Sequence, residues 1–311
     1  MRLAKALMRA FPAAPSPDDV SLAPVFRRRE YQSGTREEQD ALKLRSAEWR
    51  YQRESRADFF ETYFPTLDPT ALRGKAVLDL GAFTGGALVR WAEKYGIGDP
   101  VGLDIDPTYA EAGALFAARK RVHARFHTGF AEDMPFRDGE FDAVVSYDVF
   151  EHVRDVARTM AECFRVLKPG GYLAAAFPQY HQPAESHLAG ATALPAMHWF
   201  FSGRALAQAY YEVIRARGPD AYWYAPDGPH LQPWERSPLL NGITVRRFRA
   251  IVRAQPKWDS IYWSRRPIFN GRGRHGGVYG ALDAAFSLPA RLPVLEELFL
   301  GRICCILVKC E

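Results

Sequence analysis

The sequence has few cysteines and no long apolar run, and these two gaps exclude several classes of protein. Four of its 311 residues are cysteine, and their positions follow neither the paired spacing of a zinc site nor a disulfide framework. Two of them lie in the apolar segment 304–309, which predicts a strand with buried thiols. No apolar run approaches the roughly 20 residues that a membrane-spanning helix needs. We therefore expect a soluble, cytoplasmic protein without a membrane partner.

The net charge of the chain is modest as well. Hydrophobic residues make up 48% and charged residues 25% of the chain, and the net charge is +5, which is typical of a globular enzyme or binding protein. This charge permits an anionic substrate without requiring nucleic acid, and we expect no nucleic-acid partner. The first eleven residues are basic and amphipathic, but Lys5 and Arg9 interrupt their apolar run. A secretory signal is thereby disfavoured, and a short docking helix or a frayed terminus is expected.

Strand and helix patterns alternate between residues 75 and 180. We expect strands at 76–80, 100–104, 123–127, 141–147 and 172–177, and helices at 86–94, 109–120 and 153–166. Such alternation predicts an α/β fold with a doubly wound, mostly parallel sheet. A helical pattern over 37–64 precedes it and ends at Pro65.

The alternation stops after Pro178 and resumes near residue 244. One helix is expected at 203–217 in the interval, another at 244–254, and strands at 260–263 and 303–309. We divide the chain into an N-terminal loop and helical segment (1–74), a Rossmann-like core (75–180), an insertion that caps the sheet (181–243) and the C-terminal part of the sheet (244–311). The arginines of the 244–254 helix predict either phosphate contacts or, in preference, a solvated helix face.

A glycine-rich turn follows the first strand of the core. Asp79 ends the apolar run, and Gly81, Gly85 and Gly86 follow it. Glycine allows a close approach of the backbone to a ligand, and Asp104 at the end of the next strand can accept both hydroxyls of a ribose. No Gly-Lys-Ser/Thr sequence follows, which excludes a phosphate-binding loop.

The segment 77–86 resembles motif I of the class I S-adenosylmethionine-dependent methyltransferases. Segments 101–106, 131–136, 141–153 and 166–172 resemble later motifs of the same family in the expected order. The resemblance implies a seven-stranded sheet with S-adenosylmethionine as cofactor. It also implies donor contacts from Asp79, Gly81, Ala82, Phe83, Gly85, Asp104, Ile105, Phe130, Ala131, Glu132, Tyr147 and Asp148.

Two residues depart from the family pattern. Relatives usually carry glycine where Phe83 stands, so its ring must turn away from the donor or narrow the methionine pocket. Many relatives carry an aspartate at the position of Phe130, where it receives the adenine amino group. Glu132 or Asp133 replaces that aspartate, or Phe130 packs on the adenine ring.

The segment after the fifth strand is the candidate acceptor side, because ligands bind beyond the carboxyl ends of parallel strands. Tyr180, His181, His187 and His198 are the candidate catalytic residues, since an oxygen or nitrogen acceptor must lose a proton. Trp199, Phe200 and Phe201 are expected in the core. We expect methyl transfer to an oxygen, in preference to a nitrogen, of a small molecule such as a sugar or natural-product intermediate.

Two alternatives stay open beside this function. One is a metal-assisted methyltransferase acting on a 2′-hydroxyl or a catechol, because helical spacing puts Asp148, Glu151 and His152 roughly on one face, with His187 or His198 as a further ligand. A Glu-His pair after the fourth strand also occurs in metal-free members of the family, so we expect no metal. The other alternative is a catalytically inactive, donor-binding regulator. The oligomeric state is left open.

Overall fold

The structure is a computed structural model that describes residues 1–12, 29–183, 187–188, 191–217, 240–255, 258–267, 285, 289–292 and 295–310. The chain divides into two compact units. The sheet unit comprises Val25–Ala176, Ile251–Trp263 and Cys304–Glu311, and the α9 unit comprises Met1–Pro24, Phe177–Ala250 and Ser264–Ile303. We describe each unit on its own.

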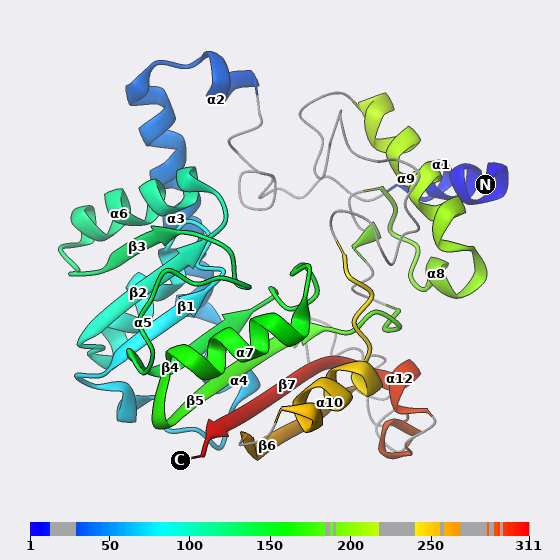
Figure 1. The fold of residues 1–311 in the computed structure, drawn as a ribbon. Helices are drawn as coiled ribbons and strands as arrows, with labels where there is room; N and C mark the ends of the chain where they lie inside the picture. Colours follow the sequence, from blue (N-terminus) through cyan, green and yellow to red (C-terminus); the bar gives the residue numbers. More distant parts are fainter. Residues whose placement is uncertain are drawn as a thin grey trace. The chain divides into compact units, whose positions relative to one another are not determined.

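Seven strands form a single sheet (Figure 1). Its strands are β1 (Ala76–Leu80), β2 (Asp99–Asp104), β3 (Arg125–Thr128), β4 (Phe141–Tyr147), β5 (Leu167–Pro178), β6 (Trp258–Pro267) and β7 (Leu300–Lys309). They lie in the order β3-β2-β1-β4-β5-β7-β6. Four neighbouring pairs are parallel: β3 with β2, β2 with β1, β1 with β4, and β4 with β5. This confirms the predicted doubly wound, seven-stranded sheet. The strand order reverses between β1 and β4, and the carboxyl ends of these strands flank the usual ligand crevice.

Helices of the sheet unit pack against these strands and against one another. They are α2 (Arg29–Ser33), α3 (Arg36–Arg56), α4 (Phe59–Tyr63), α5 (Gly86–Tyr95), α6 (Pro107–Lys120) and α7 (Val156–Val166), with a 3-10 turn at Pro69–Leu72. α3 packs against α5 and α6, and α6 contacts β2 and β3. A long N-terminal helix is therefore attached directly to the donor half of the sheet.

The helical pattern predicted over 37–64 is two helices with a break between them. α3 ends at Arg56, and Asp58 begins α4 by accepting hydrogen bonds from the N–H groups of Phe60 and Glu61 (2.9 and 3.2 Å). Asp58 also accepts a hydrogen bond from the Tyr95 hydroxyl (2.6 Å). The prediction of one continuous helix was wrong because the aromatic residues continue across the break while the backbone turns at a capping aspartate.

A buried carboxylate joins α3, α4 and α5. Glu54 accepts hydrogen bonds from the indole N–H of Trp91 and the backbone N–H of Phe59, both at 2.6 Å. Burial raises the pKa of Glu54, and these two donors lower it. The surrounding core is aromatic, with Phe59, Phe60 and Trp91 in mutual ring contact. This anchor fixes the last turns of α3 beside β1 and β4.

The α9 unit has a core of its own. It contains α1 (Arg2–Ala10), α8 (Met197–Phe200), α9 (Gly203–Arg217) and most of α10 (Val245–Ala254), with a 3-10 turn at Pro289–Arg291 and a short helix α12 (Glu296–Phe299). Ala4 and Met8 of α1 pack with Leu206 and Tyr210 of α9. The first residues thus form the docking helix that was one of the two expectations.

The arginines of α10 have different surroundings. The Arg249 guanidinium donates to the buried Glu296 carboxylate at 2.7 Å, whereas Arg246 and Arg247 are exposed.

Cys163, Cys304 and Cys305 are buried free thiols, as predicted, and Cys310 is exposed. Among the described residues, no helix combines the length and the apolar character that crossing a membrane requires.

Candidate functional site

The glycine turn between β1 and α5 packs tightly on its neighbours. Gly81 has φ +80°, and a Cβ atom there would lie 2.2 Å from Cγ2 of Val149. Gly85 has φ +76°, and its Cβ would lie 2.7 Å from Cα of Gly113. The N–H groups of Gly81 and Ala82 both donate to the carbonyl oxygen of Leu103, at 2.8 and 3.0 Å. The turn therefore needs glycine for its backbone conformation and for close packing on β2, α6 and the end of β4.

Phe83 occupies the middle of this turn with φ 49°. Its ring lies against the ring of Tyr109 on α6, with the two centroids 4.5 Å apart. Its backbone N–H donates to Oδ2 of Asp104 at 2.8 Å. The side chain is thus held by a contact within the protein, while the backbone supports the acid at the end of β2.

Asp104 is a desolvated carboxylate held by backbone donors. Burial raises its pKa to about 6, although the N–H groups of Phe83, Asp106 and Ile105 lower it. Oδ1 lies 3.4 Å from the N–H of Asp106. Each carboxylate oxygen has more than one acceptor position, so Asp104 can still accept hydrogen bonds from a diol.

Two large apolar side chains next to Asp104 are exposed. Ile105 is 66% exposed and Phe130, in the loop after β3, is 52% exposed. Arg154 lies over the Phe130 ring at 5.5 Å from its centroid. Exposed apolar side chains at the carboxyl end of a parallel sheet offer a flat ligand two surfaces to pack on.

Glu132 is committed to the start of α7. Its Oε1 accepts hydrogen bonds from the N–H groups of Arg154 (2.6 Å) and Asp155 (3.3 Å). The side chain of Asp133 is 85% exposed, and Ala131 is buried. Of the three options for the adenine contact, the arrangement favours packing by Phe130.

Asp79 is the buried acid at the end of β1. It is 4% exposed and receives no hydrogen bond from any described residue. Burial raises its pKa to about 7, while the positive charge of Arg50 lowers it. A buried carboxylate without a hydrogen-bond donor is costly, and such a group suits a cationic ligand.

The sequence of this region matches a known family. Residues 78–175 match the family model described as "Methyltransferase domain". Residues 78–175 are therefore a methyltransferase domain, which agrees with the resemblance to the class I S-adenosylmethionine-dependent methyltransferases and with S-adenosylmethionine as the implied cofactor.

Named relatives align with this methyltransferase domain. A tocopherol O-methyltransferase of Arabidopsis thaliana is 39% identical over 99 residues, which cover 31% of this chain and 28% of that protein. An O-methyltransferase of ubiquinone biosynthesis from Mesorhizobium japonicum is 33% identical over 109 residues, covering 34% and 43%. A demethylmenaquinone methyltransferase of Deinococcus radiodurans is 33% identical over 144 residues, covering 44% and 58%. The chain thus spans less than two thirds of each relative.

Solved methyltransferase structures also resemble the chain. An S-adenosylmethionine-dependent methyltransferase from Mesorhizobium loti is 17% identical, with a TM-score of 0.48, and the match covers 80% of this chain and 97% of that one.

Near Asp79 lies an arginine that sequence analysis missed and that precedes the matched residues 78–175. Arg50 of α3 lies with its guanidinium 5.1 Å from the centroid of the Tyr147 ring. It makes no ion pair or hydrogen bond with any described residue, and burial lowers its pKa. The methionine end of the cofactor carries one ammonium and one carboxylate group. Asp79 and Arg50 offer opposite charges to both, so the residues present fit the cofactor.

Tyr147 ends β4 in a polar and aromatic cluster. Its hydroxyl lies 3.1 Å from that of Tyr63 and 3.3 Å from a guanidinium nitrogen of Arg53. Its ring contacts Phe59, with centroids 5.4 Å apart. Tyr147 therefore holds α3 and α4 at the carboxyl end of β4 in the methyltransferase domain.

The segment after Tyr147 is a turn. Asp148 has φ 57°, and its N–H donates to the carbonyl oxygen of Ala176 at 3.0 Å. Residues 149–153 form one turn, and α7 begins only at Val156. The buried Glu151 lies 3.7 Å from Nε2 of His152. Asp148 does not share a helix face with these two residues, because its left-handed backbone conformation lies outside the turn.

Three of the four candidate catalytic residues lie together in the α9 unit. The Tyr180 ring lies 5.2 Å from the His181 ring and 5.5 Å from the His198 ring. The indole N–H of Trp199 donates to the carbonyl oxygen of His181 at 2.7 Å. Burial lowers the pKa of His198, which keeps its imidazole neutral near pH 7. His187 has φ 57°.

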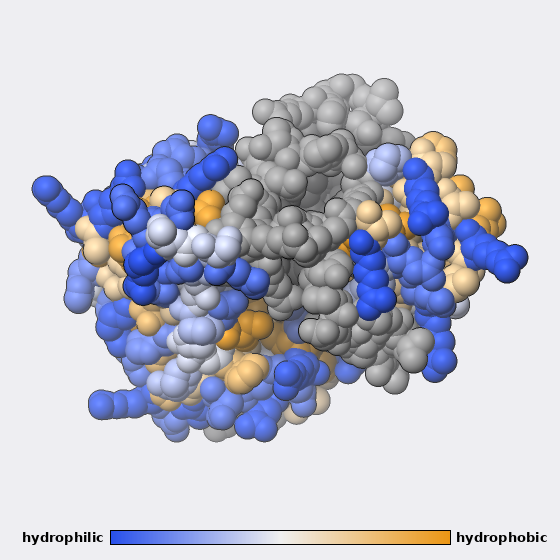
Figure 2. Space-filling view, turned by 90° about the horizontal axis from the view of Figure 1, so that it is seen from above, coloured by the Kyte–Doolittle hydropathy of each residue, from blue (hydrophilic) through white to orange (hydrophobic). Residues whose placement is uncertain are grey.

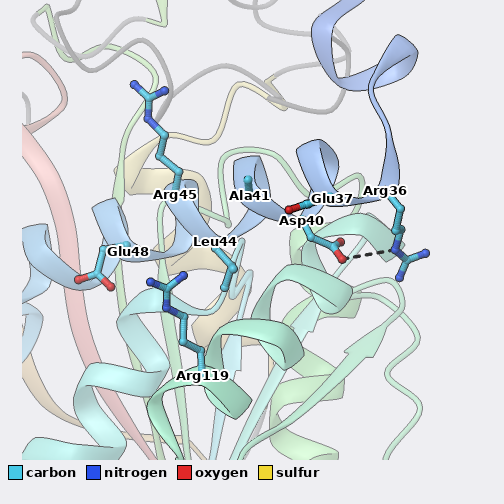
Figure 3. Close-up of a pocket in the computed structure, with 8 residues that line it drawn as sticks. All are labelled: Arg36, Glu37, Asp40, Ala41, Leu44, Arg45, Glu48 and Arg119. Atoms are coloured by element: carbon cyan, nitrogen blue, oxygen red, sulfur yellow. Dashed lines mark ion pairs between the residues drawn. The ribbon is translucent and has the colours of Figure 1, made fainter.

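A separate cavity of about 810 Å³ lies along α3 and α6 (Figure 3). Its lining residues are Arg36, Glu37, Asp40, Ala41, Leu44, Arg45, Glu48 and Arg119. Arg36 pairs with Asp40 at 3.5 Å and also with Glu111, and Glu48 pairs with Lys120 at 3.1 Å. None of the predicted donor-site residues lines this cavity, so we do not assign the donor to it.

Proposed function

We propose that this protein transfers the methyl group of S-adenosylmethionine to an oxygen atom of a small-molecule acceptor. The cofactor supplies a methyl group already activated on a sulfonium centre. The protein's task is then to orient the donor, position the acceptor and take up a proton. The acceptors in the names of the relatives differ, so the shared domain supports the reaction type and leaves the acceptor class to experiment.

The observation that carries the proposal is the opposed pair Asp79 and Arg50. The Asp79 carboxylate is buried without a hydrogen-bond donor among the described residues, and Arg50 contacts the Tyr147 ring but makes no hydrogen bond or ion pair with a described residue. We assign Asp79 to the ammonium and Arg50 to the carboxylate of the methionine end. Asp104 accepts from the ribose hydroxyls, and Ile105 and Phe130 pack on the adenine. This assignment gives a ligand contact to the two buried acids, to Arg50 and to the two exposed apolar side chains described above.

On the acceptor side we assign proton transfer to the cluster of Tyr180, His181 and His198, with His187 as a further candidate. An acceptor oxygen that receives a methyl group must lose its proton, and a neutral imidazole of this cluster would take that proton up. The lowered pKa of His198 suits that role, because a base must be unprotonated before it acts.

Calorimetry with three ligands tests the donor assignment. S-adenosylmethionine and S-adenosylhomocysteine have the carboxylate, whereas 5′-methylthioadenosine lacks it. We expect Arg50→Ala to weaken binding of the first two by about 1.5–3 kcal/mol, the contribution of a hydrogen bond to a charged group. Binding of 5′-methylthioadenosine stays unchanged. Arg45→Ala, on the exposed side of the same helix, is the matched control. An equal loss for all three ligands contradicts the assignment of Arg50.

An acceptor panel tests the reaction itself. Turnover is followed as S-adenosylhomocysteine formed with hydroxylated and amino acceptors. Donor binding without turnover on the whole panel favours the inactive, donor-binding regulator. Turnover that disappears after chelation and returns with a divalent cation favours metal assistance.

A further inference from the structure

Among the exposed large apolar side chains in the described part of the α9 unit, four lie on α1 and α8 or directly after α1. Phe200 is 78% exposed and Trp199 is 42% exposed on α8, while Leu3 is 63% and Phe11 51% exposed on and just after α1. The expectation that Trp199 and Phe200 lie in the core is wrong. They follow Met197, which is buried in the core of the unit, and project from a helix of four residues.

α1 has one packed face and one outward face. Ala4 and Met8 are buried against α9. Leu3, Ala6 and Ala10 are all exposed, and their spacing of three and four residues places them on a single stripe of the helix. Packing within the unit explains Ala4 and Met8 but gives no reason for a leucine on the outward stripe.

The charges beside this stripe are all positive. α1 carries Arg2, Lys5 and Arg9 and no acidic residue. Lys5 pairs with Glu212 of α9. Arg2 and Arg9 are exposed and form no ion pair with a described residue. The outward side of α1 therefore offers an exposed leucine flanked by two exposed guanidinium groups.

α1 and α8 pack on the same helix of the α9 unit. Both helices contact α9. The carbonyl oxygen of Phe11 accepts hydrogen bonds from the N–H of Ala193 (3.0 Å) and the hydroxyl of Thr192 (2.6 Å). α8 starts at Met197, so the end of α1 is tied to the segment leading into α8. On the right of Figure 2, apolar and strongly hydrophilic residues lie next to one another on this unit.

We propose that this α1–α8 surface, formed by Arg2, Leu3, Arg9, Phe11, Trp199 and Phe200, binds the surface of an anionic phospholipid bilayer. Tryptophan and phenylalanine insert at the boundary between headgroups and acyl chains, and arginine is attracted to anionic headgroups. The bilayer removes the exposed apolar area from water and pairs the unpaired arginines. The inferred partner is a membrane surface, whereas the sequence alone led us to expect none.

Vesicle co-sedimentation of the full chain tests this inference. The probes are phosphatidylcholine vesicles with and without phosphatidylglycerol, at low and high salt. We expect binding to the anionic vesicles only, and weaker binding at high salt. Arg2→Glu together with Arg9→Glu lowers the partition coefficient by at least about fivefold per arginine. Leu3→Ser and Phe200→Ser each lower it by about tenfold.

Matched variants elsewhere keep the test specific. Arg137→Glu with Arg253→Glu makes the same charge change at exposed positions, and Leu292→Ser removes a leucine that is 54% exposed. These controls retain vesicle binding. We expect all variants to keep the donor affinity and the thermal stability of the unchanged protein, and these two measurements check that each variant folds.

Three results overturn the inference: no binding to anionic vesicles, equal binding to neutral and anionic vesicles, or unchanged binding in the α1 and α8 variants. The outcome does not depend on methyl transfer, since vesicle binding is measured without donor or acceptor. An acidic protein as the true partner of this surface would give the first of these results.

Discussion

The backbone N–H of Phe83 donates a 2.8 Å hydrogen bond to Oδ2 of Asp104. This contact joins the glycine turn to the acid at the end of β2, and it comes from the backbone, so it does not depend on the side chain at position 83. It explains how phenylalanine is accommodated where the family usually has glycine. The ring takes a place against Tyr109, and the N–H still orients the carboxylate.

Replacing Asp104 by alanine is expected to weaken donor binding by about 3 kcal/mol, because two charge-assisted hydrogen bonds to the ribose are lost. Calorimetry with S-adenosylmethionine measures the change. Asp133→Ala removes an exposed carboxylate in the next loop and serves as the control. Unchanged affinity in Asp104→Ala would reject the ribose role, provided that thermal unfolding shows a folded protein despite the loss of the Phe83 contact.

Phe83→Gly tests whether the aromatic side chain shapes the donor pocket. We expect unchanged donor affinity. The lost ring contact costs about 0.5–1.5 kcal/mol, and relief of the left-handed backbone conformation returns roughly 1–2 kcal/mol, so the free energy of unfolding changes little. Tyr109→Ala removes the same ring contact without that relief and is the comparison. A marked loss of donor affinity in Phe83→Gly alone would show that the ring contributes to the pocket.

The strands that flank the glycine turn could be predicted almost residue for residue. β1 and β4 are buried apolar runs, and the structure has them at Ala76–Leu80 and Phe141–Tyr147 as expected. Arg50 could not be found in this way, because its role depends on α3 packing beside β1 in three dimensions. Phe200 was misassigned because large aromatic side chains are usually buried, and exposure on a short helix leaves no periodic signal.

Asp79→Asn is expected to stabilise the free protein above pH 7. The pKa of Asp79 is raised from 3.8 to about 7 in the folded protein. Folding therefore favours the protonated acid. Asp79 does not lower the free energy of unfolding below pH about 4, where it is protonated in both states, and it lowers it most above pH about 7. At 1.36 kcal/mol per pKa unit, this cost is at most about 4 kcal/mol.

The gain from Asp79→Asn should therefore be largest at pH 8 and disappear near pH 4, as measured by chemical denaturation at both pH values. The same variant should bind S-adenosylmethionine more weakly at pH 8, since the ammonium group loses its counter-charge. A variant that is destabilised at pH 8 would show that the carboxylate has a partner in the free protein.

The affinity of the protein for its methyl donor should fall as the pH is lowered. The folded pKa of Asp104 is raised to about 6, and protonation converts one of its acceptors into a donor. Binding of 5′-methylthioadenosine, which has the ribose but no ammonium or carboxylate group, should weaken as the pH falls through about 6. In Asp104→Asn this pH dependence should be absent. If the dependence persists in that variant, another group near the adenosine site is being protonated.

Single replacements of His181, His187 and His198 by alanine test the proton acceptor on whichever substrate shows turnover. At least one should lower kcat by roughly 10²–10⁴-fold, the usual contribution of general base catalysis, with donor affinity unchanged. Since burial lowers the pKa of His198, a profile governed by His198 has its acid limb below the ordinary histidine value. Tyr180→Phe separates a contribution of the phenol from that of the ring, because it keeps the contacts to His181 and His198. Three histidine variants that are all fully active would place the base outside this cluster.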